Sequence, residues 1–327
     1  MKDLGLHRPQ TLAGLVVLAG VLALGATVGV SSIAGFDAIA HRLLHVHWFW
    51  LPVAFGAQVV AYVGYIAAYK GVATAEEGPE LKLPHAAALV ATGFGVFVLA
   101  GGFALDEAAL TRTGLTRREA RERVLGLATL EYVVLAPVAA AAAGVAFFQD
   151  GVSPGLTLPW LIGVPVGGIL ALSLIRYRGS FDGARRRAFR AIGHALAGLA
   201  LILRMATRPD LYGVAFLGIA LYWVGDIGCL WAALNLVFAQ PPPLAELLVG
   251  YATGYALTRR TLPLGGAGVV ETLLPLSLGW VGIALAPAVL AVVGYRVINL
   301  WLPLIPAVAG LPMLQRLGHR RTRAGVA

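Results

Sequence analysis

Four ionisable side chains lie within long apolar segments of this chain: Glu131, Asp226, Glu271 and Arg296. A charge at the centre of a bilayer costs at least about 2.5–3.5 kcal/mol on insertion scales, so each of the four is a candidate for a functional site. An arginine at such a depth can attract an anionic group, and a carboxylate can pair with that arginine. The chemistry expected of this set is therefore anion binding or ion pairing within a membrane.

Glu271 and Arg296 lie on consecutive apolar segments. Arg296 is roughly 15 Å from the outer end of its segment, and Glu271 is roughly 10 Å from the cytoplasmic end of the preceding one. The short connection near Ala286 makes the two segments antiparallel neighbours, so their side chains are within reach of each other. Two compatible interpretations stay open: a structural ion pair that fixes helix packing, and an arginine that also faces a cavity and attracts a lipid headgroup.

Asp226 and Glu131 have less certain surroundings. Asp226 is near the middle of its segment, with Trp223, Trp231 and Asn235 close by in sequence. It either makes a polar contact between buried helices or faces a cavity. Glu131 is nearer the cytoplasmic face, where it either belongs to the same site or faces a nearby arginine-rich loop.

The stretch "TLPLGGAGVVETLLPL" places helix-breaking residues directly before Glu271. Pro263 and the glycines at 265, 266 and 268 interrupt the chain where an apolar segment begins. A helix that starts near Gly266 or Gly268 presents free N–H groups and the positive end of its dipole. Such helix starts within membranes bind anionic substrate groups, and a lipid phosphate suits this position. The alternative is that the glycines only allow helices to approach closely.

A weak internal repeat accompanies this stretch. Gly101 and Gly102 are followed by Glu107 and Leu110 with the same spacing, GG-x4-E-x2-L, as Gly265 and Gly266 are followed by Glu271 and Leu274. Matched interruptions in two halves of a chain are typical of transporter binding sites.

Composition predicts the elements that must position these groups. The 327 residues are 59% hydrophobic and 13% charged, whereas soluble domains have about 25% charged residues. We expect an all-α polytopic membrane protein that forms one integral membrane domain over residues 1–327, with a short basic cytoplasmic tail at 312–327. The net charge of +9 comes from arginines in short loops, which is the positive-inside pattern and indicates anionic phospholipid headgroups, with no nucleic acid, as partners.

Eight apolar runs are long enough or nearly long enough to cross a bilayer, which takes about 20 residues. The predicted spans are Leu12–Ala34, Trp48–Tyr69, Val124–Phe148, Leu158–Ile175, Leu211–Phe238, Leu244–Leu257, Leu264–Leu285 and Pro287–Leu311.

Two further runs, Pro84–Leu105 and Ala191–Met205, are ambiguous. If both crossed, eleven arginines in two loops would face outward, against the positive-inside rule. We therefore expect the first to be re-entrant or shallow and the second to be interfacial, with both termini in the cytoplasm.

Other kinds of chemistry find little support. His41, His45 and His47 adjoin tryptophans at a predicted membrane interface, where such residues commonly lie, so no metal site is expected. The sequence has no GxxxxGK[ST] loop for a nucleotide and no set of nucleophile, base and orienting residue. We expect no cofactor and no catalytic site.

The segment "LTRRTLPLGGAGVVETLLPLSLGWVGIALAPAVLAVVGYRVINLWLPLIPAVAGL" resembles the closing signature of the lysylphosphatidylglycerol synthase transmembrane, or flippase-like, family. The motif of a proline, glycines and a glutamate occupies Pro263 to Glu271, and the arginine that follows in the family corresponds to Arg296, with Trp301 after it. Leu264 departs from the pattern by separating the proline from the glycines.

The resemblance implies a flippase-like fold. In this family the membrane part of the multiple peptide resistance factor resembles a flippase for lysylphosphatidylglycerol, and other members are linked to hopanoid or isoprenoid-phosphate pathways. The synthase activity belongs to a separate soluble domain, which we do not expect in this chain.

We therefore expect a multi-pass protein of the bacterial inner membrane that translocates a phospholipid or related lipid between leaflets. The alternative is a non-transporting membrane partner of a lipid-modifying enzyme, and an integral-membrane transferase is less favoured. The candidate lipid-binding residues are Arg296, Glu271, Gly265, Gly266, Gly268, Asp226 and Glu131.

Overall fold

The computed structural model describes residues 9–93, 103–148, 152–182, 187–237, 242–256 and 262–305, and every regular element within these ranges is a helix. The all-α fold expected from the composition is thereby confirmed. The long helices are α1 (Pro9–Ala34), α3 (Trp50–Ala73), α6 (Arg117–Phe147), α7 (Pro154–Leu174), α9 (Arg187–Ala206) and α10 (Pro209–Val237).

Shorter helices connect or complete these. The α-helices are α2 (Phe36–Leu43), α4 (Leu83–Thr92), α5 (Phe103–Arg112), α8 (Arg178–Asp182), α11 (Leu244–Tyr251), α12 (Val269–Trp280) and α13 (Leu285–Arg296). The 3-10 turns are η3 (Ile175–Tyr177) and η5 (Pro263–Gly266), and the π-helical turns are η4 (Ala252–Ala256) and η6 (Val297–Trp301).

Six of the described helices are long and apolar enough to cross a membrane, namely α1, α3, α6, α7 continued to Phe181, α9 and α10. Five of them match predicted spans. Because a helix satisfies all of its backbone hydrogen bonds internally, such apolar segments are stable in lipid. The predicted count of eight full-length spans is not confirmed.

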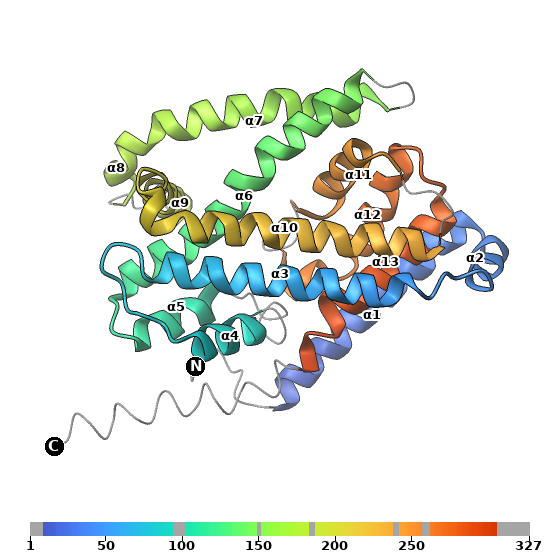
Figure 1. Cartoon of the computed structure of the whole chain (residues 1–327), viewed down its shortest axis with the longest axis horizontal. Coiled ribbons are helices and arrows are strands. Elements are labelled where there is room, and N and C mark those ends of the chain that lie inside the picture. The colour runs from blue at the N-terminus through green and yellow to red at the C-terminus, as the bar shows by residue number, and fades with distance from the viewer. Residues whose placement is uncertain are drawn as a thin grey trace.

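Helices α3 and α10 lie side by side through the centre of the molecule (Figure 1). Glycines allow their backbones to approach: a Cβ on Gly218 would lie 2.6 Å from the Gly64 carbonyl oxygen, and one on Gly225 would lie 2.4 Å from the Ala61 nitrogen. Small residues at helix contacts are the usual means of close packing in membranes, where van der Waals contact drives association.

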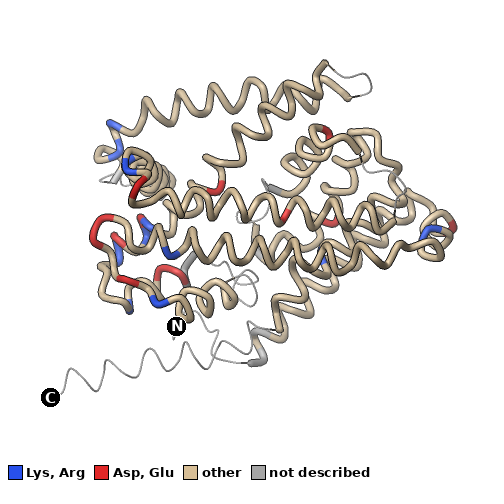
Figure 2. Tube along the Cα trace, in the orientation of Figure 1, with Lys and Arg blue, Asp and Glu red and all other residues tan. Residues whose placement is uncertain are grey.

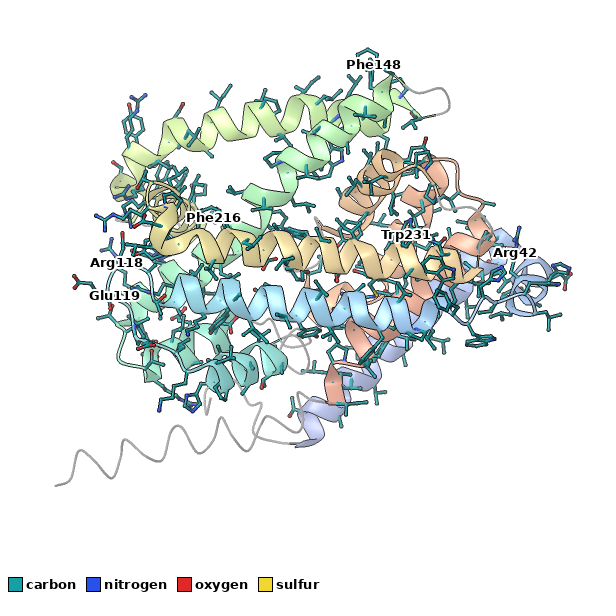
Figure 3. The ribbon with its side chains drawn as sticks, in the orientation of Figure 1. Arg42, Arg118, Glu119, Phe148, Phe216 and Trp231 are labelled. Atoms are coloured by element: carbon teal, nitrogen blue, oxygen red, sulfur yellow. The ribbon has the colours of Figure 1, made fainter. Side chains whose placement is uncertain are left out.

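Most of the described Lys and Arg residues lie at one end of the bundle, which we call the basic end (Figure 2). Helix α6 begins there with a capping box, in which the Thr116 hydroxyl accepts a bond from the Glu119 N–H and the Glu119 carboxylate accepts one from the Thr116 N–H. The buried Arg123 donates to the Ala73 and Ala75 carbonyl oxygens at 3.1 and 2.6 Å, and so satisfies the C-terminal end of α3. Figure 3 shows Arg118 and Glu119 at the basic end and Phe148 at the far end of the same helix.

Helix α9 is viewed nearly end-on in Figure 1, so it runs across the direction of α3 and α10 at the basic end. Its N-terminal turns carry Arg190 and its last turn Arg204, and it packs on α6 where Gly198 meets Gly126. By length and composition α9 could cross a membrane, and the interfacial placement of residues 191–205 stays a prediction.

Two hairpins of short helices complete the fold. Helices α4 and α5 leave and return to the basic end, in agreement with the predicted re-entrant segment 84–105, whose middle lies outside the described residues. Helix α11 with η4 and helix α12 after η5 leave and return to the opposite end (Figure 1). Residues 244–257 and 264–285, predicted as full spans, are therefore two half-length arms, since each arm ends in the middle of the bundle.

The glycine contacts between α3 and α10 predict a sharp difference between two glycines of α10. Replacing Gly218 by Ala places a methyl group against backbone atoms of α3, and such overpacking costs about 1–3 kcal/mol. A Cβ on Gly213 meets no atom within 4 Å, so Gly213→Ala is the matched control. Thermal unfolding of the purified variants in detergent should show a lowered midpoint for Gly218→Ala alone, and equal midpoints would contradict the close α3–α10 contact.

Candidate polar centre in the middle of the bundle

The chain is broken between η5 and α12 by a run of left-handed backbone. Leu264, Gly265, Gly266 and Gly268 have φ values of 59°, 62°, 69° and 86°. Glycine adopts these values at little cost, whereas a leucine in this region is strained. Helix α12 begins at Val269 with Gly268 as its N-cap residue, which confirms the helix start predicted near this glycine.

The carboxylate of Glu271 links the broken segment to α13. One carboxylate oxygen accepts a bond of 2.7 Å from the Gly268 N–H, and the other accepts a bond of 2.7 Å from Arg296 Nε. Arg296 also donates through Nη2 to the Gly265 carbonyl oxygen at 3.0 Å. The predicted pairing of Glu271 with Arg296 is therefore present, and it holds η5, α12 and α13 to one another.

The pair is closed in this conformation, since both side chains are only 3% exposed. Of the N–H groups at the start of α12 that were expected to attract a phosphate, that of Gly268 already bonds to the carboxylate of Glu271. Helix α1 covers the break, with Ala19 and Ala23 packed against Ala267 beside the partly buried Trp301. In this state Glu271 and Arg296 form an ion pair that fixes the packing of the helices. Lipid contact by Arg296, Glu271 or the glycines stays a prediction.

Asp226 is the centre of a second set of contacts about 18 residues into α10. It accepts hydrogen bonds from the hydroxyls of Tyr251 and Tyr295 and from the Asn299 side-chain amide, the Tyr295 bond being 2.7 Å long. The Tyr255 hydroxyl donates to the Asn299 side-chain oxygen at 2.9 Å. These donors belong to the α11–η4 arm and to α13–η6, so one fully buried carboxylate links three segments.

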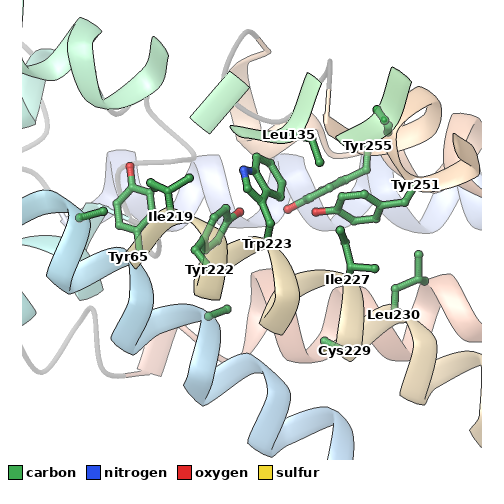
Figure 4. Packing of buried hydrophobic residues seen from close by; sticks show 14 of the residues in the cluster. Tyr65, Leu135, Ile219, Tyr222, Trp223, Ile227, Cys229, Leu230, Tyr251 and Tyr255 are labelled. Carbon is green, nitrogen blue, oxygen red and sulfur yellow. The ribbon is translucent and has the colours of Figure 1, made fainter. Parts of the chain in front are cut away.

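The aromatic rings around Asp226 form a continuous buried layer. Tyr251 lies 6.1 Å from Trp223 and 5.2 Å from Tyr255, and Tyr255 lies 5.5 Å from Tyr295. Figure 4 shows Tyr251 and Tyr255 extending from the hairpin toward the tryptophan of α10. The arm is thus fixed to the bundle both by ring packing and by its bonds to the carboxylate.

Glu131 lies beside the aromatic layer of this centre. It is 2% exposed and accepts a hydrogen bond of 2.9 Å from the Tyr65 hydroxyl, while its backbone oxygen accepts one from Trp223 Nε1. It therefore joins α3, α6 and α10 within the core. Through Trp223 it adjoins the aromatic layer around Asp226.

Sequence reasoning missed the partners of Asp226. The nearby Asn235 bonds to the Trp231 carbonyl oxygen of its own helix. The direct partners of Asp226 are Tyr251, Tyr295 and Asn299, and Tyr255 bonds to Asn299. Tyr251 with Tyr255, and Tyr295 with Asn299, are hydroxyl and amide side chains spaced four residues apart in apolar segments. This spacing places both members on one helix face, and it is the signal that could have identified them.

The hairpin at the basic end has a related arrangement. Glu107 of α5 accepts two bonds, at 3.0 and 3.1 Å, from Arg121 of the following helix, as Glu271 of α12 pairs with Arg296 of the following helix. The Glu107 pair is partly exposed. The weak repeat noted in the sequence thus corresponds to two hairpins that enter from opposite ends, each with a glutamate that pairs with an arginine of the next helix.

The buried pair predicts a strong non-additivity. Glu271→Gln leaves the Arg296 charge buried without its partner, which costs about 3–5 kcal/mol, and Arg296→Gln leaves the carboxylate uncompensated. The double variant Glu271→Gln/Arg296→Gln removes both charges, so it should be more stable than the sum of the single effects by about 1–3 kcal/mol. Unfolding of all four proteins in detergent measures this coupling, and additive losses would show that the two side chains do not stabilise each other.

Asp106 of α5 predicts a pH effect at the basic end. Burial raises the pKa of its carboxyl to about 7, although a hydrogen bond from the Tyr69 hydroxyl opposes the rise. The unfolded value is about 3.9, so folding favours the protonated form. The contribution of the protonated Asp106 carboxyl to the free energy of unfolding is fully present below about pH 4 and is lost as the pH rises through about 7. Unfolding midpoints measured from pH 5 to 8 should therefore fall more steeply for the wild type than for Asp106→Asn, and parallel curves would contradict the buried carboxyl.

Comparison with known proteins assigns the family. The sequence profile of the lysylphosphatidylglycerol synthase TM region matches residues 11–307 of the 327. No curated protein matches the chain. The matched range contains all of the long helices, both hairpins and the polar centre, apart from the first two residues of α1. The chain therefore belongs to the lysylphosphatidylglycerol synthase transmembrane family and is a multi-pass membrane protein.

Proposed function

We propose that this protein translocates a glycerophospholipid with an anionic headgroup between the leaflets of a bacterial inner membrane. The basic end would face the cytoplasm, because arginine and lysine are concentrated on the cytoplasmic side of membrane proteins. Both termini would then be cytoplasmic. Family membership supports a membrane protein of this type, and the transport function rests on the arrangement of the hairpins.

The observation that carries the proposal is the interrupted α11–α12 hairpin, in which η5 and the start of α12 lie at the buried charges of Glu271 and Arg296. Broken helices that meet polar side chains near the middle of the bilayer are characteristic of transporter sites. Non-helical backbone at such a depth is tolerated only where protein or a water-filled cavity surrounds it. Here protein surrounds it, so we interpret the described conformation as the closed one.

Glu271 indicates how the site would open. Its carboxylate lies where Arg296, the start of α12 and the Gly268 N–H converge. A lipid phosphate carries the same kind of charge and accepts the same donors. We therefore propose that the headgroup replaces Glu271 as the partner of Arg296 when the hairpin moves away from α13. Asp226 would hold the hairpin in place between transport events, since it bonds to Tyr251 of the arm and to α13–η6.

A leaflet-exchange assay tests this function. Proteoliposomes with fluorescent phosphatidylglycerol, quenched from outside by dithionite, should show faster exchange with the wild type than liposomes without protein. The Glu271→Gln/Arg296→Gln variant, which avoids an unpaired buried charge, should fold but exchange lipid at least tenfold more slowly, because it has no cation for the phosphate.

Two outcomes would count against the proposal. Exchange by the wild type no faster than in protein-free liposomes would contradict translocation. Wild-type rates in the folded double variant would remove Arg296 from the mechanism, as would an Arg296→Ala variant that exchanges lipid as fast as the wild type.

A further inference from the structure

Helix α7 is covered less by the rest of the protein than the other long helices are. None of the residues in its most apolar stretch is buried, whereas 56% of the corresponding stretch of α10 is buried. Its main packing is on α6, with which it forms a hairpin at the end of the bundle opposite the basic end (Figure 1). An apolar helix that is so little covered by its own chain exposes a wide surface to the hydrocarbon of a membrane.

A large cavity lies along this helix, between α6 and α7, and we call it the α6–α7 bay. Its volume is about 1160 Å³, and none of its lining residues is charged. Its walls include Tyr132, Val133 and Ala136 of α6 and Gly163, Gly167 and Leu172 of α7. An apolar space of this size is suited to hydrocarbon chains.

The bay is nearly as long as the hydrocarbon core of a membrane is thick. On α7 it extends from Gly155 to Leu172, and at 1.5 Å per residue this distance is about 25 Å. The hydrocarbon core of a bilayer measures about 30 Å. Chains within the bay could therefore stay in apolar surroundings at every depth between the two leaflets.

The two ends of the bay differ in charge. At the basic end Leu172 is followed one turn later by the exposed Arg176 and then by the exposed Arg178, while Arg204, next to the lining Leu203, is paired with Glu76. At the opposite end the bay is lined by Ser153 and Gly155. A molecule with an apolar tail and a negative head is complementary to the basic end, where two exposed arginines can contact a phosphate.

The bay also touches the interrupted hairpin. Thr253 of η4 and Trp280 of α12 both line it, and Trp160 of α7 donates a hydrogen bond of 2.9 Å to the Thr253 hydroxyl. Thr253 lies two residues after Tyr251, which bonds to Asp226. The arm that is bonded to Asp226 through Tyr251 therefore forms part of the wall of the bay.

From these observations we infer that the α6–α7 bay binds the acyl chains of a glycerophospholipid, whose anionic phosphate lies at the basic end beside Arg176 and Arg178. The inference rests on the proposed translocation for its purpose, since it assigns the place of the lipid before its headgroup moves to the polar centre. Binding itself can be measured without transport.

The glycines of α7 allow a direct test. A Cβ on Gly163 or Gly167 meets no atom within 4 Å, so phenylalanine at both positions fills space in the bay without a backbone clash. Gly25 and Gly29 of α1 have the same four-residue spacing, are also exposed and also have no atom within 4 Å. The variant Gly25→Phe/Gly29→Phe is therefore the matched control for Gly163→Phe/Gly167→Phe.

The experiment uses the full chain in phosphatidylcholine nanodiscs with a small amount of phosphatidylglycerol that carries a photoreactive diazirine on one acyl chain. Mass spectrometry should locate cross-links on the bay residues of α6 and α7 in the wild type and in the α1 control. The bay-filling variant should lose them at least fivefold. Arg176→Gln/Arg178→Gln should reduce labelling by this probe and leave labelling by a diacylglycerol probe, which has the same acyl chains and no phosphate, unchanged.

Two results would overturn the inference: labelling of the bay no stronger than that of the membrane-facing side of α3, or labelling that the bay-filling variant retains. If that variant unfolds, as judged by its thermal midpoint, Gly163→Leu replaces it with the same expectation. Failure of the two proposals can be told apart. A labelled bay in a protein that exchanges no lipid contradicts translocation alone, and lipid exchange with an unlabelled bay contradicts only the acyl-chain site.

Discussion

An interrupted helix can lie in the middle of a bilayer only if its charges and its free backbone groups find partners within the protein. In this chain the carboxylate of Glu271 meets that requirement, because it bonds to both the Gly268 N–H and Arg296. Arg296 in turn bonds to the Gly265 carbonyl oxygen. Without the Glu271 carboxylate, the strained left-handed run and the buried Arg296 cation would lie in an apolar environment with no partner for the charge. The hairpin could not stay at this depth.

Asp226 adds a second restraint to the same hairpin. Its donors come from the arm before the break, Tyr251, and from the helix after the hairpin, Tyr295 and Asn299. The two arms are therefore held by different groups, one by Glu271 and the other by Asp226. Hydrogen bonds between buried polar groups have defined geometry, and alternative partners can replace them. This combination suits an element that is ordered in one state and released in another.

Much of the fold could be predicted because a 20-residue apolar run has few other solutions in a membrane protein. Helices α1, α3, α6, α7 and α10 follow from that constraint. The prediction of residues 244–257 and 264–285 as two full spans is not confirmed. Apolar length alone does not distinguish a span from a half-length arm, and the arms of 13 and 12 residues are separated by the break at Pro263 and the glycines.

The polar centre was predictable in part. Depth along consecutive antiparallel segments was enough to pair Glu271 with Arg296, because a charge in lipid has few other partners. The partners of Asp226 were missed because they lie on other elements, Tyr251 on α11, Tyr295 on α13 and Asn299 on η6. Depth along one helix does not show which side chains of distant segments face a buried carboxylate.

Hydrogen exchange in nanodiscs tests most directly whether Asp226 holds the hairpin. The variant Asp226→Asn replaces the carboxylate, and Asp210→Asn, at the exposed start of the same helix, is its control. If Asp226 restrains the hairpin, amide protection should fall in residues 247–256 and 269–274 of Asp226→Asn, stay unchanged in α3 and α6, and match the wild type throughout Asp210→Asn. Unchanged protection in the hairpin, or an equal loss across all helices, would contradict the role of this carboxylate as the restraint on a movable element.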